Sequence, residues 1–175
     1  MKKICFIVLA LVYFCAAKSQ EPVTKVVKFT RFIDDKLFAF RWNALNEFSC
    51  ELKNLKIISL RDAPDCLKKS KEIKKFESAH KKEIEKIIKP GFNYYVTNYG
   101  QYRNGFICDV SDDKDNFRLL LVKNGYAIPY GDSEVLIKAH EEAKKDKRGM
   151  YSAKFWDVTN CILNGVPIPK KDEDR

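Results

Sequence analysis

The sequence predicts an α+β fold in which a five-stranded barrel carries three helices. This prediction depends on the order of the elements: three β-rich runs, a long helical pattern, two more β-rich runs and two further helices. The chain length agrees, because the roughly 155 residues that follow a leader-like segment suffice for one hydrophobic core. No internal repeat and no Gly- or Ser-rich linker divides the sequence, which indicates a single domain.

Residues 1–19 have the features of a secretory signal peptide. Met1-Lys2-Lys3 supplies a positive start, and the apolar run over residues 4–17 is too short to span a bilayer. We expect cleavage after Ala17 or Ser19, with a retained signal anchor as the alternative. The mature chain is expected to be secreted or to occupy a secretory lumen, which is the periplasm or the extracellular space in a bacterium. No later run is apolar enough to span a membrane, so we expect no membrane partner after cleavage.

The charge of the mature chain favours polyanionic partners. Removing residues 1–19 takes away three lysines and no acid, which leaves 30 basic against 24 acidic residues and a net charge of +6. A positive surplus of that size attracts nucleic acids and other polyanions. Because 33% of all residues are charged, an ordinary solvated surface is the alternative interpretation.

Four cysteines remain after the leader, and an even number in an oxidising compartment predicts two disulfides. The sequence does not distinguish the three possible pairings. The disulfide candidates are Cys50, Cys66, Cys108 and Cys161. No Cys-x-x-Cys pair exists, and we interpret His80 and His140 as solvent-facing helix residues, so no zinc site is expected.

The first half of the domain is β-rich. Residues 23–42 contain two β-rich runs around the polar break Asp34-Asp35-Lys36, which predicts a hairpin, and residues 50–60 supply a third strand. This strand leads to a corner at Pro64, which has no backbone donor and biases Ala63 away from helical geometry.

That corner presents two carboxylates, Asp62 and Asp65, on a tight turn. Such an arrangement suits a hard cation or a site that activates a phosphodiester. The alternative is that Asp62 supports the turn and Asp65 caps the next helix.

The second half alternates helices and strands. The predicted elements are a helix over residues 67–88 with one apolar and one lysine-rich face, strands over 92–97 and 105–110 joined by a polar segment, and helices over 116–123 and from Asp132 or Ser133 to Arg148. We assign residues 20–155 to the domain and 156–175 to a C-terminal extension. Trp156 and Cys161 are expected to hold the first half of the extension down, and its end is expected to be disordered.

Five short strands with a helix between the third and fourth follow the plan of an oligonucleotide-binding (OB) barrel. Five motifs, in order over residues 24–152, give the chain a resemblance to the staphylococcal nuclease (thermonuclease) family. They are Phe32-Ile33-Asp34-Asp35-Lys36, Asp62-Ala63-Pro64-Asp65, Tyr102-Arg103-Asn104-Gly105, Leu121-Val122-Lys123-Asn124-Gly125-Tyr126-Ala127, and the stretch from Ala139 to Gly149-Met150-Tyr151.

The resemblance implies a Ca²⁺-dependent phosphodiesterase that cuts DNA and RNA, but this chain departs from the metal-binding pattern. Asp62 is kept as a metal ligand, whereas Lys36 falls at the position of the second ligand Asp. An ammonium there should abolish or severely weaken Ca²⁺ binding. Asp65 replaces the family's Glu and is one methylene shorter. A one-residue slip that places Asp35 at the ligand position is the alternative.

The two phosphate-binding arginines that the resemblance implies are also altered. The first is Ile57 here, and the second becomes Asn104 with Arg103 beside it. Losing a bidentate arginine removes stabilisation of the transition state, at a cost of roughly a hundredfold or more in rate. A slip that places Arg103 in the second position is the alternative. Lys56 adjoins the first position, but strand alternation is expected to point it to the opposite face.

The leading hypothesis is a secreted nuclease-like domain, inactive or weakly active, that binds single-stranded nucleic acid or another polyanion. Tyr102 and Tyr130 are the predicted stacking residues, and no cofactor is expected. The first alternative is a Ca²⁺-dependent endonuclease that uses Asp35 and Asp62 as metal ligands, with Asp65 and Arg103 as catalytic residues. The second is a disulfide-stabilised module that binds another protein.

Overall fold

The computed structural model describes residues 21–33, 37–57, 71–103 and 105–165. The barrel strands are β1 (Val23–Ile33), β2 (Leu37–Arg41), β3 (Glu47–Leu52), β5 (Asn93–Tyr102) and β6 (Gly105–Ser111), and two short strands, β4 (Leu55–Lys56) and β7 (Ile128–Pro129), pair with each other. The helices are α1 (Lys71–Ile87), α2 (Phe117–Lys123), α3 (Glu134–Lys145), the 3-10 turn η2 (Gly149–Tyr151) and α4 (Trp156–Asn164).

The five barrel strands close in the order β1-β2-β3-β6-β5. Strands β3 and β6 run parallel, and every other neighbouring pair in the barrel is antiparallel. Leaving out the short β4, this is the order first, second, third, fifth, fourth, with α1 between the third and fourth strands. The predicted α+β fold with an OB-type barrel is therefore confirmed.

Large aromatic side chains fill the barrel. Phe29 of β1 and Phe38 and Phe40 of β2 have no exposed surface, and the ring centroids of Phe29 and Phe40 lie 5.4 Å apart. Burying each such side chain contributes about 1.5–3 kcal/mol. The β-rich runs that predicted β1 and β2 in the sequence thus also supply the aromatic side chains of the core.

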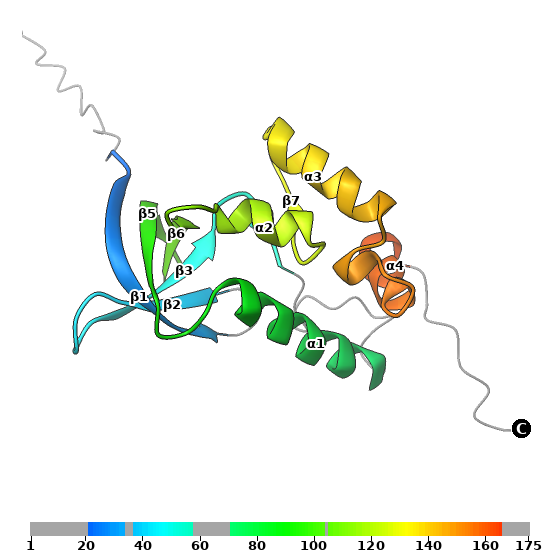
Figure 1. Ribbon diagram of the computed structural model, residues 1–175, viewed down its shortest axis with the longest axis horizontal. Helices are drawn as coiled ribbons and strands as arrows, with labels where there is room; N and C mark the ends of the chain where they lie inside the picture. The colour runs from blue at the N-terminus through cyan, green and yellow to red at the C-terminus, as the bar shows by residue number, and fades with distance from the viewer. Residues whose placement is uncertain (1–20, 34–36, 58–70, 104, 166–175) are drawn as a thin grey trace, which may run out of the picture.

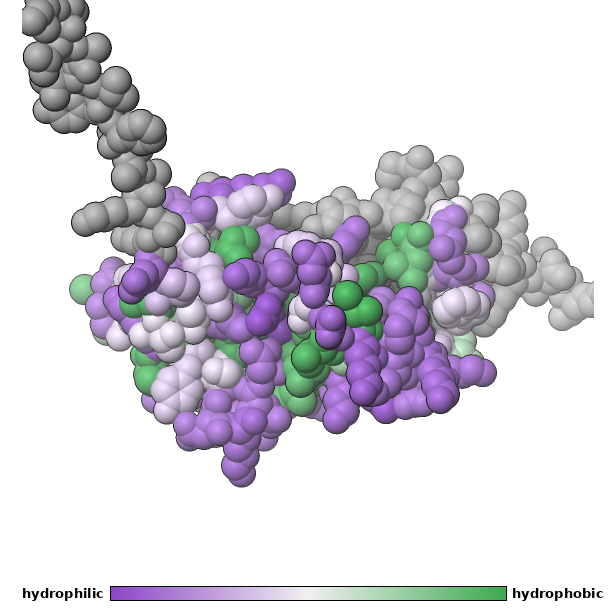
Figure 2. Space-filling model, turned by 90° about the horizontal axis from the view of Figure 1, so that it is seen from above, coloured by the Kyte–Doolittle hydropathy of each residue, from purple (hydrophilic) through white to green (hydrophobic). Residues whose placement is uncertain are grey.

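The helices lie to one side of the barrel (Figure 1). Ile84 of α1, the adjoining Ile88, and Phe117 and Leu121 of α2 belong to the barrel core. Farther from the barrel, a second apolar cluster joins α1, α3, η2 and α4 through Phe76, Ala143, Met150, Tyr151, Val158 and Cys161. The face of the molecule in Figure 2 is mostly hydrophilic, and its apolar side chains appear in several separate small areas.

A disulfide between Cys50 and Cys108 joins the two parallel strands β3 and β6. Both cysteines are fully buried. Cys161 is also disulfide-bonded, whereas Cys66 lies outside the described residues. One of the bridges left open by the sequence is therefore Cys50–Cys108.

Two strand boundaries differ from the prediction. The third strand begins at Glu47 and stops at Leu52, because the chain turns at Asn54, which has a positive φ of 57°. Strand β5 continues to Tyr102, through most of the segment predicted to be a loop, and its pairing with β6 shifts register between Asn98 and Gln101. Polar residues concealed this extension, because the end of β5 is exposed and needs no apolar alternation.

The interpretation of both histidines as solvent-facing was wrong. His80 is 5% exposed, and its Nε2 lies 2.6 Å from the carbonyl oxygen of Tyr126. Burial lowers the pKa of His80 to about 4, against the opposing effect of this hydrogen bond. His140 is buried too, and its Nε2 bonds to the hydroxyl of Tyr151. His80 occupies the same helical stripe as Phe76 and Ile84, which places it on the apolar face of α1.

Helix α4 was not predicted, so the described part of the chain has four α-helices rather than three. It packs through Val158 and Cys161, and the hydroxyl of Thr159 donates to the carbonyl of Met150. It ends at Gly165, whose left-handed conformation suits glycine. Cys161 holds the first half of the extension down as expected, whereas Trp156 is 46% exposed and does not belong to this apolar cluster. Residues 166–175 lie outside the described part.

Among the described residues, none of the helices combines the length and the apolar character needed to cross a membrane.

Candidate nucleic-acid interface

A hollow of about 360 Å³, called the cleft below, opens beside the outer face of β3. Its walls combine two tyrosines, three charged side chains and three apolar ones. They are Tyr102, Tyr130, Glu51, Lys56, Arg103, Leu52, Leu55 and Ile57. In an OB barrel, ligands bind on the face of the second and third strands and beside the loop between the fourth and fifth, which here is the β5–β6 turn.

Two exposed tyrosines face the cleft from different elements. Tyr102 is the last residue of β5 and is 44% exposed, and Tyr130 follows β7 and is 50% exposed. The backbone N–H of Tyr130 donates to the carbonyl of Asn54 at 3.0 Å, which ties this residue to the β3–β4 turn. Burial raises the pKa of the Tyr130 hydroxyl, and so does the negative charge of Glu51. The structure thus brings together the two tyrosines that the sequence suggested for stacking.

Arg103 lies in the turn after β5, where its backbone takes a left-handed φ of 50°. Its guanidinium carbon is 5.1 Å from the centre of the Tyr102 ring, and its side chain lines the cleft. It makes no ion pair with any carboxylate among the described residues. An arginine that contacts an aromatic face and has no ion pair within the described ranges keeps its fork of N–H donors available to a phosphate.

At the position where the resemblance implies the first arginine, the cleft wall carries an apolar side chain. Ile57 is 5% exposed and lines the cleft together with Leu55. Lys56 is exposed between the buried Leu55 and Ile57, which agrees with the expected alternation, and it also borders the hollow. Strand β4 contains only two residues and forms the edge of the hollow, so both of its faces border it. Lys56 supplies a positive charge there but not the bidentate geometry of an arginine.

Glu51 is a cleft residue that the sequence analysis missed. Its neighbours Cys50 and Leu52 are buried in the barrel, so Glu51 points outward, toward the cleft. The alternation in β3 indicates the outward orientation of Glu51, but the pattern of one strand does not show which other elements border the same face.

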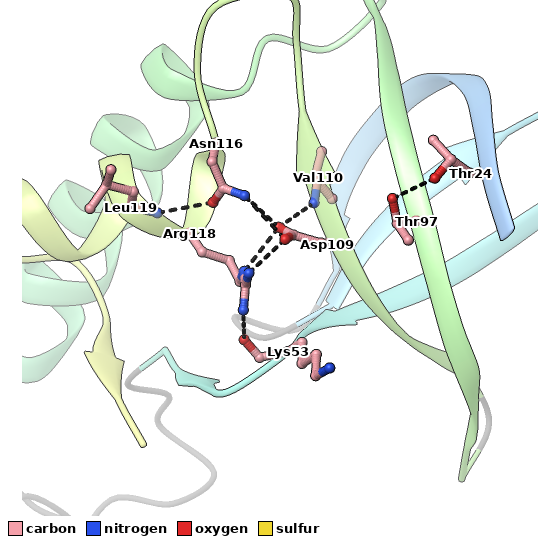
Figure 3. Close-up of polar contacts among 8 residues, drawn as sticks. All are labelled: Thr24, Lys53, Thr97, Asp109, Val110, Asn116, Arg118 and Leu119. Atoms are coloured by element: carbon pink, nitrogen blue, oxygen red, sulfur yellow. Dashed lines mark hydrogen bonds and ion pairs between the residues drawn. The ribbon is translucent and has the colours of Figure 1, made fainter. Parts of the chain in front are cut away.

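A network centred on Arg118 holds the β3–β4 turn (Figure 3). Its guanidinium donates to both carboxylate oxygens of Asp109, at 2.9 and 2.6 Å, and to the carbonyl of Lys53 at 3.2 Å. Asn116 adds two donations to Asp109, at 3.0 and 3.1 Å, and its own side-chain oxygen caps α2 through the N–H of Leu119. This network fixes the carbonyl of Lys53, one residue before Asn54, and thereby helps to position the wall of the cleft that carries Tyr130.

Lys53 also supports an aromatic side chain near this turn. Its ammonium group lies 3.8 Å from the centre of the Tyr99 ring. Its backbone N–H donates to the carbonyl of Cys108 at 2.8 Å. Both backbone groups of Lys53 are therefore engaged, and its side chain pairs a positive charge with a half-exposed ring.

The predicted metal site lies outside the described residues. Asp35, Lys36, Asp62 and Asp65 all belong to segments 34–36 and 58–70, as Asn104 belongs to the undescribed position 104. Within the described ranges no three His, Cys, Asp or Glu side chains gather as a metal site would require. The prediction of weak or absent Ca²⁺ binding at Lys36 therefore stays a prediction.

Comparison with protein families identifies the domain. Residues 57–153 match the family described as staphylococcal nuclease homologue. The chain belongs to this family. The match begins at Ile57 and includes α1, β5, β6, α2, β7, α3 and η2, while the structure supplies the preceding strands of the barrel. No curated protein matches the chain.

Membership in the staphylococcal nuclease family associates the chain with a nuclease-related function. The barrel, the Tyr102–Arg103 turn and the α3–η2 end of the matched stretch agree with the motifs on which the resemblance was based. The first-turn motif over residues 32–36 lies before the matched stretch. The activity depends on the residues that line the cleft and not on the fold alone, since one fold supports many functions.

Proposed function

We propose that this staphylococcal nuclease homologue is a secreted protein that binds single-stranded nucleic acid in the cleft and has little or no nuclease activity. The observation that carries the proposal is the convergence of Tyr102, Tyr130 and Arg103 on one hollow. Exposed tyrosines stack on bases at about 1–3 kcal/mol each, and an arginine adds a contact to the phosphate.

A basic face of α1 supports the same function. Lys74, Lys75 and Lys82 border one shallow depression, and they form no ion pair with any described carboxylate. Such a surface adds salt-dependent attraction to a polyanion. It carries no base selectivity, so the stacking residues of the cleft distinguish the proposal from simple charge attraction.

We expect low nuclease activity because Ile57 forms part of the cleft wall. A buried isoleucine lines the cleft where the resemblance implies a phosphate-binding arginine. An apolar side chain there gives no donor to the charge that develops on the phosphate, and a loss of that kind costs on the order of a hundredfold in rate. Lys36 at the expected ligand position would weaken Ca²⁺ binding as well, and no cofactor is proposed.

Fluorescence anisotropy tests the binding proposal. Labelled ten-residue oligo(dT) and oligo(rU) are titrated with the mature protein at low salt, with heparin as a competing polyanion. We expect saturable binding that heparin displaces only at a large excess, and that weakens in a Tyr102→Leu/Tyr130→Leu variant. Affinity for the oligonucleotides no better than for heparin, and insensitive to the two tyrosines, would overturn the proposal.

A cleavage assay tests the proposed lack of activity. The same oligonucleotides are incubated with protein in Ca²⁺ or in chelator, and we expect no chelator-sensitive cleavage above background. Rapid Ca²⁺-dependent cleavage would instead favour the endonuclease alternative, which Arg103 in the cleft supports. Capture of a protein partner, combined with no affinity for oligonucleotides, would favour the protein-binding module.

A further inference from the structure

Glu51 is a carboxylate with no pairing partner among the described residues, in a cleft whose other charged groups, Lys56 and Arg103, are positive. Within the described ranges it makes no hydrogen bond and no ion pair. A negative charge beside a phosphate path is repulsive, so a surface built only to hold a backbone gains nothing from it. Its presence is explained if the ligand brings donors to it.

The position of Glu51 keeps its carboxylate near the stacking residues. In the barrel register it is paired with Leu37 of β2 on one side and with Ile107 of β6 on the other. Both neighbours are apolar and partly buried, so neither offers a donor from its side chain. The carboxylate therefore lies between two apolar side chains on the outer face of the sheet, in the same hollow as Tyr102 and Tyr130.

We propose that Glu51 makes the cleft selective for guanine by accepting hydrogen bonds from the N1–H and the N2 amino group of a base stacked on the tyrosines. This inference rests on the proposed binding of single-stranded nucleic acid and deepens it. Tyr102 and Tyr130 hold the ring face, Arg103 meets the backbone, and Glu51 reads the edge of the base.

Hydrogen-bond geometry selects guanine among the bases. A carboxylate presents two acceptors side by side, and guanine presents two donors side by side on its Watson–Crick edge. Adenine and cytosine place one amino group beside a ring acceptor, and thymine and uracil place one N–H between two carbonyl oxygens. Guanine is thus the base that satisfies both oxygens without repulsion. A bidentate contact to a base discriminates by a factor on the order of ten or more.

Anisotropy titrations with four labelled oligonucleotides test the inference. One contains only thymine, and the others replace its central base with guanine, adenine or cytosine. We expect the guanine oligonucleotide to bind about tenfold more tightly than the thymine one. The Glu51→Gln variant removes one acceptor and one negative charge, so the guanine preference should disappear while affinity for the thymine oligonucleotide rises.

The opposite direction of these two changes separates base reading from a general charge effect. Glu134→Gln, at the start of α3 and outside the cleft, makes the same charge change and should leave the guanine preference intact. Equal binding of the four oligonucleotides by the native protein, or a guanine preference that survives Glu51→Gln, overturns the inference and leaves the proposed function standing. If no oligonucleotide binds, the proposed function fails and the inference with it.

Discussion

Two arginines of this domain show how differently one residue type is used on the two sides of the cleft. Arg118, on the β6–α2 side, is bound by Asp109 through two nitrogens and by the carbonyl of Lys53, and its side chain is 19% exposed. Arg103, on the β5–β6 turn, is exposed and contacts the Tyr102 ring at 5.1 Å. The first arginine has its charge neutralised within the protein, and the second keeps it available.

This difference between the two arginines shows which side of the cleft is structural scaffold and which side is available to a ligand. On the β6–α2 side, the polar side chains hydrogen-bond to one another and to the backbone. These bonds fix the turn at Lys53 and Asn54. The opposite side carries exposed aromatic rings and charged side chains that have few partners among the described residues. Ligand sites held on a rigid support are expected to show this division.

The largest effect should come from breaking the scaffold side. Arg118→Met leaves the mostly buried Asp109 carboxylate without its cation and frees the carbonyl of Lys53, so we expect a loss of about 3 kcal/mol in the free energy of unfolding. Urea denaturation measures it. The matched variant Arg103→Met should change stability by no more than about 0.5 kcal/mol. Equal losses in the two variants would contradict the division between scaffold and ligand side.

Acid should weaken the scaffold through His80, which joins α1 to the end of α2. Its pKa is about 4 in the folded protein against an ordinary value of 6.5, so below pH 6.5 the unfolded chain binds the proton more readily. Stability is therefore fully present above pH 6.5 and falls as pH drops toward 4, by up to about 3 kcal/mol. Burial also lowers the pKa of His140, which adds to the trend in the same direction.

Urea midpoints at pH 7.5 and pH 4.5 measure this dependence. A His80→Gln variant keeps an amide donor toward the carbonyl of Tyr126 but cannot titrate, so its midpoint should fall much less across the same range. A variant with the same pH dependence as the native protein would exclude His80 as the cause.

On the ligand side, stacking should dominate affinity. Tyr130→Leu removes an exposed ring from the cleft, and we expect affinity for oligo(dT) to fall about tenfold, within the range measured for one stacked base. The control is Tyr95→Leu on the outer face of β5, a residue that is 41% exposed and does not line the cleft. Similar losses in both variants would show that binding does not use the cleft.

The smallest effect should come from the available arginine. Arg103→Met removes one phosphate contact, so the slope of log affinity against log salt should become shallower by about 0.7. Titrations at several salt concentrations measure the slope. Arg31→Met changes an arginine that is already paired with Glu47, at 2.6 Å, and should leave the slope unchanged. An unchanged slope in Arg103→Met would remove this residue from the interface.

The fold was predictable because its signals are local. Two β-rich runs around a polar break identified β1 and β2, and a helical stripe ending at Pro90-Gly91 identified α1. The same stripe contained the signal for the burial of His80, since Phe76, His80 and Ile84 recur at helical spacing. Helix α4 gave a weaker signal, because nine residues with three β-branched ones resemble a loop or a strand equally well.

The cleft was only partly predictable because its parts meet through strand register. Tyr102, Arg103 and Tyr130 were found through motif resemblance and residue type. Glu51 lies within the predicted third strand, but its pairing with Ile107 appears in no local pattern. The contact between Arg118 and Asp109 requires the relative placement of α2 and β6, which periodicity does not provide.

Photocrosslinking tests the central claim most directly. An oligonucleotide that carries 5-iodouracil is irradiated with the mature protein at low salt, and the crosslinked peptides are mapped by mass spectrometry. Because this base reacts with the aromatic rings on which it stacks, the account predicts crosslinks at Tyr102 and Tyr130. Crosslinks found only at residues outside the cleft, or none despite saturating binding, would contradict it.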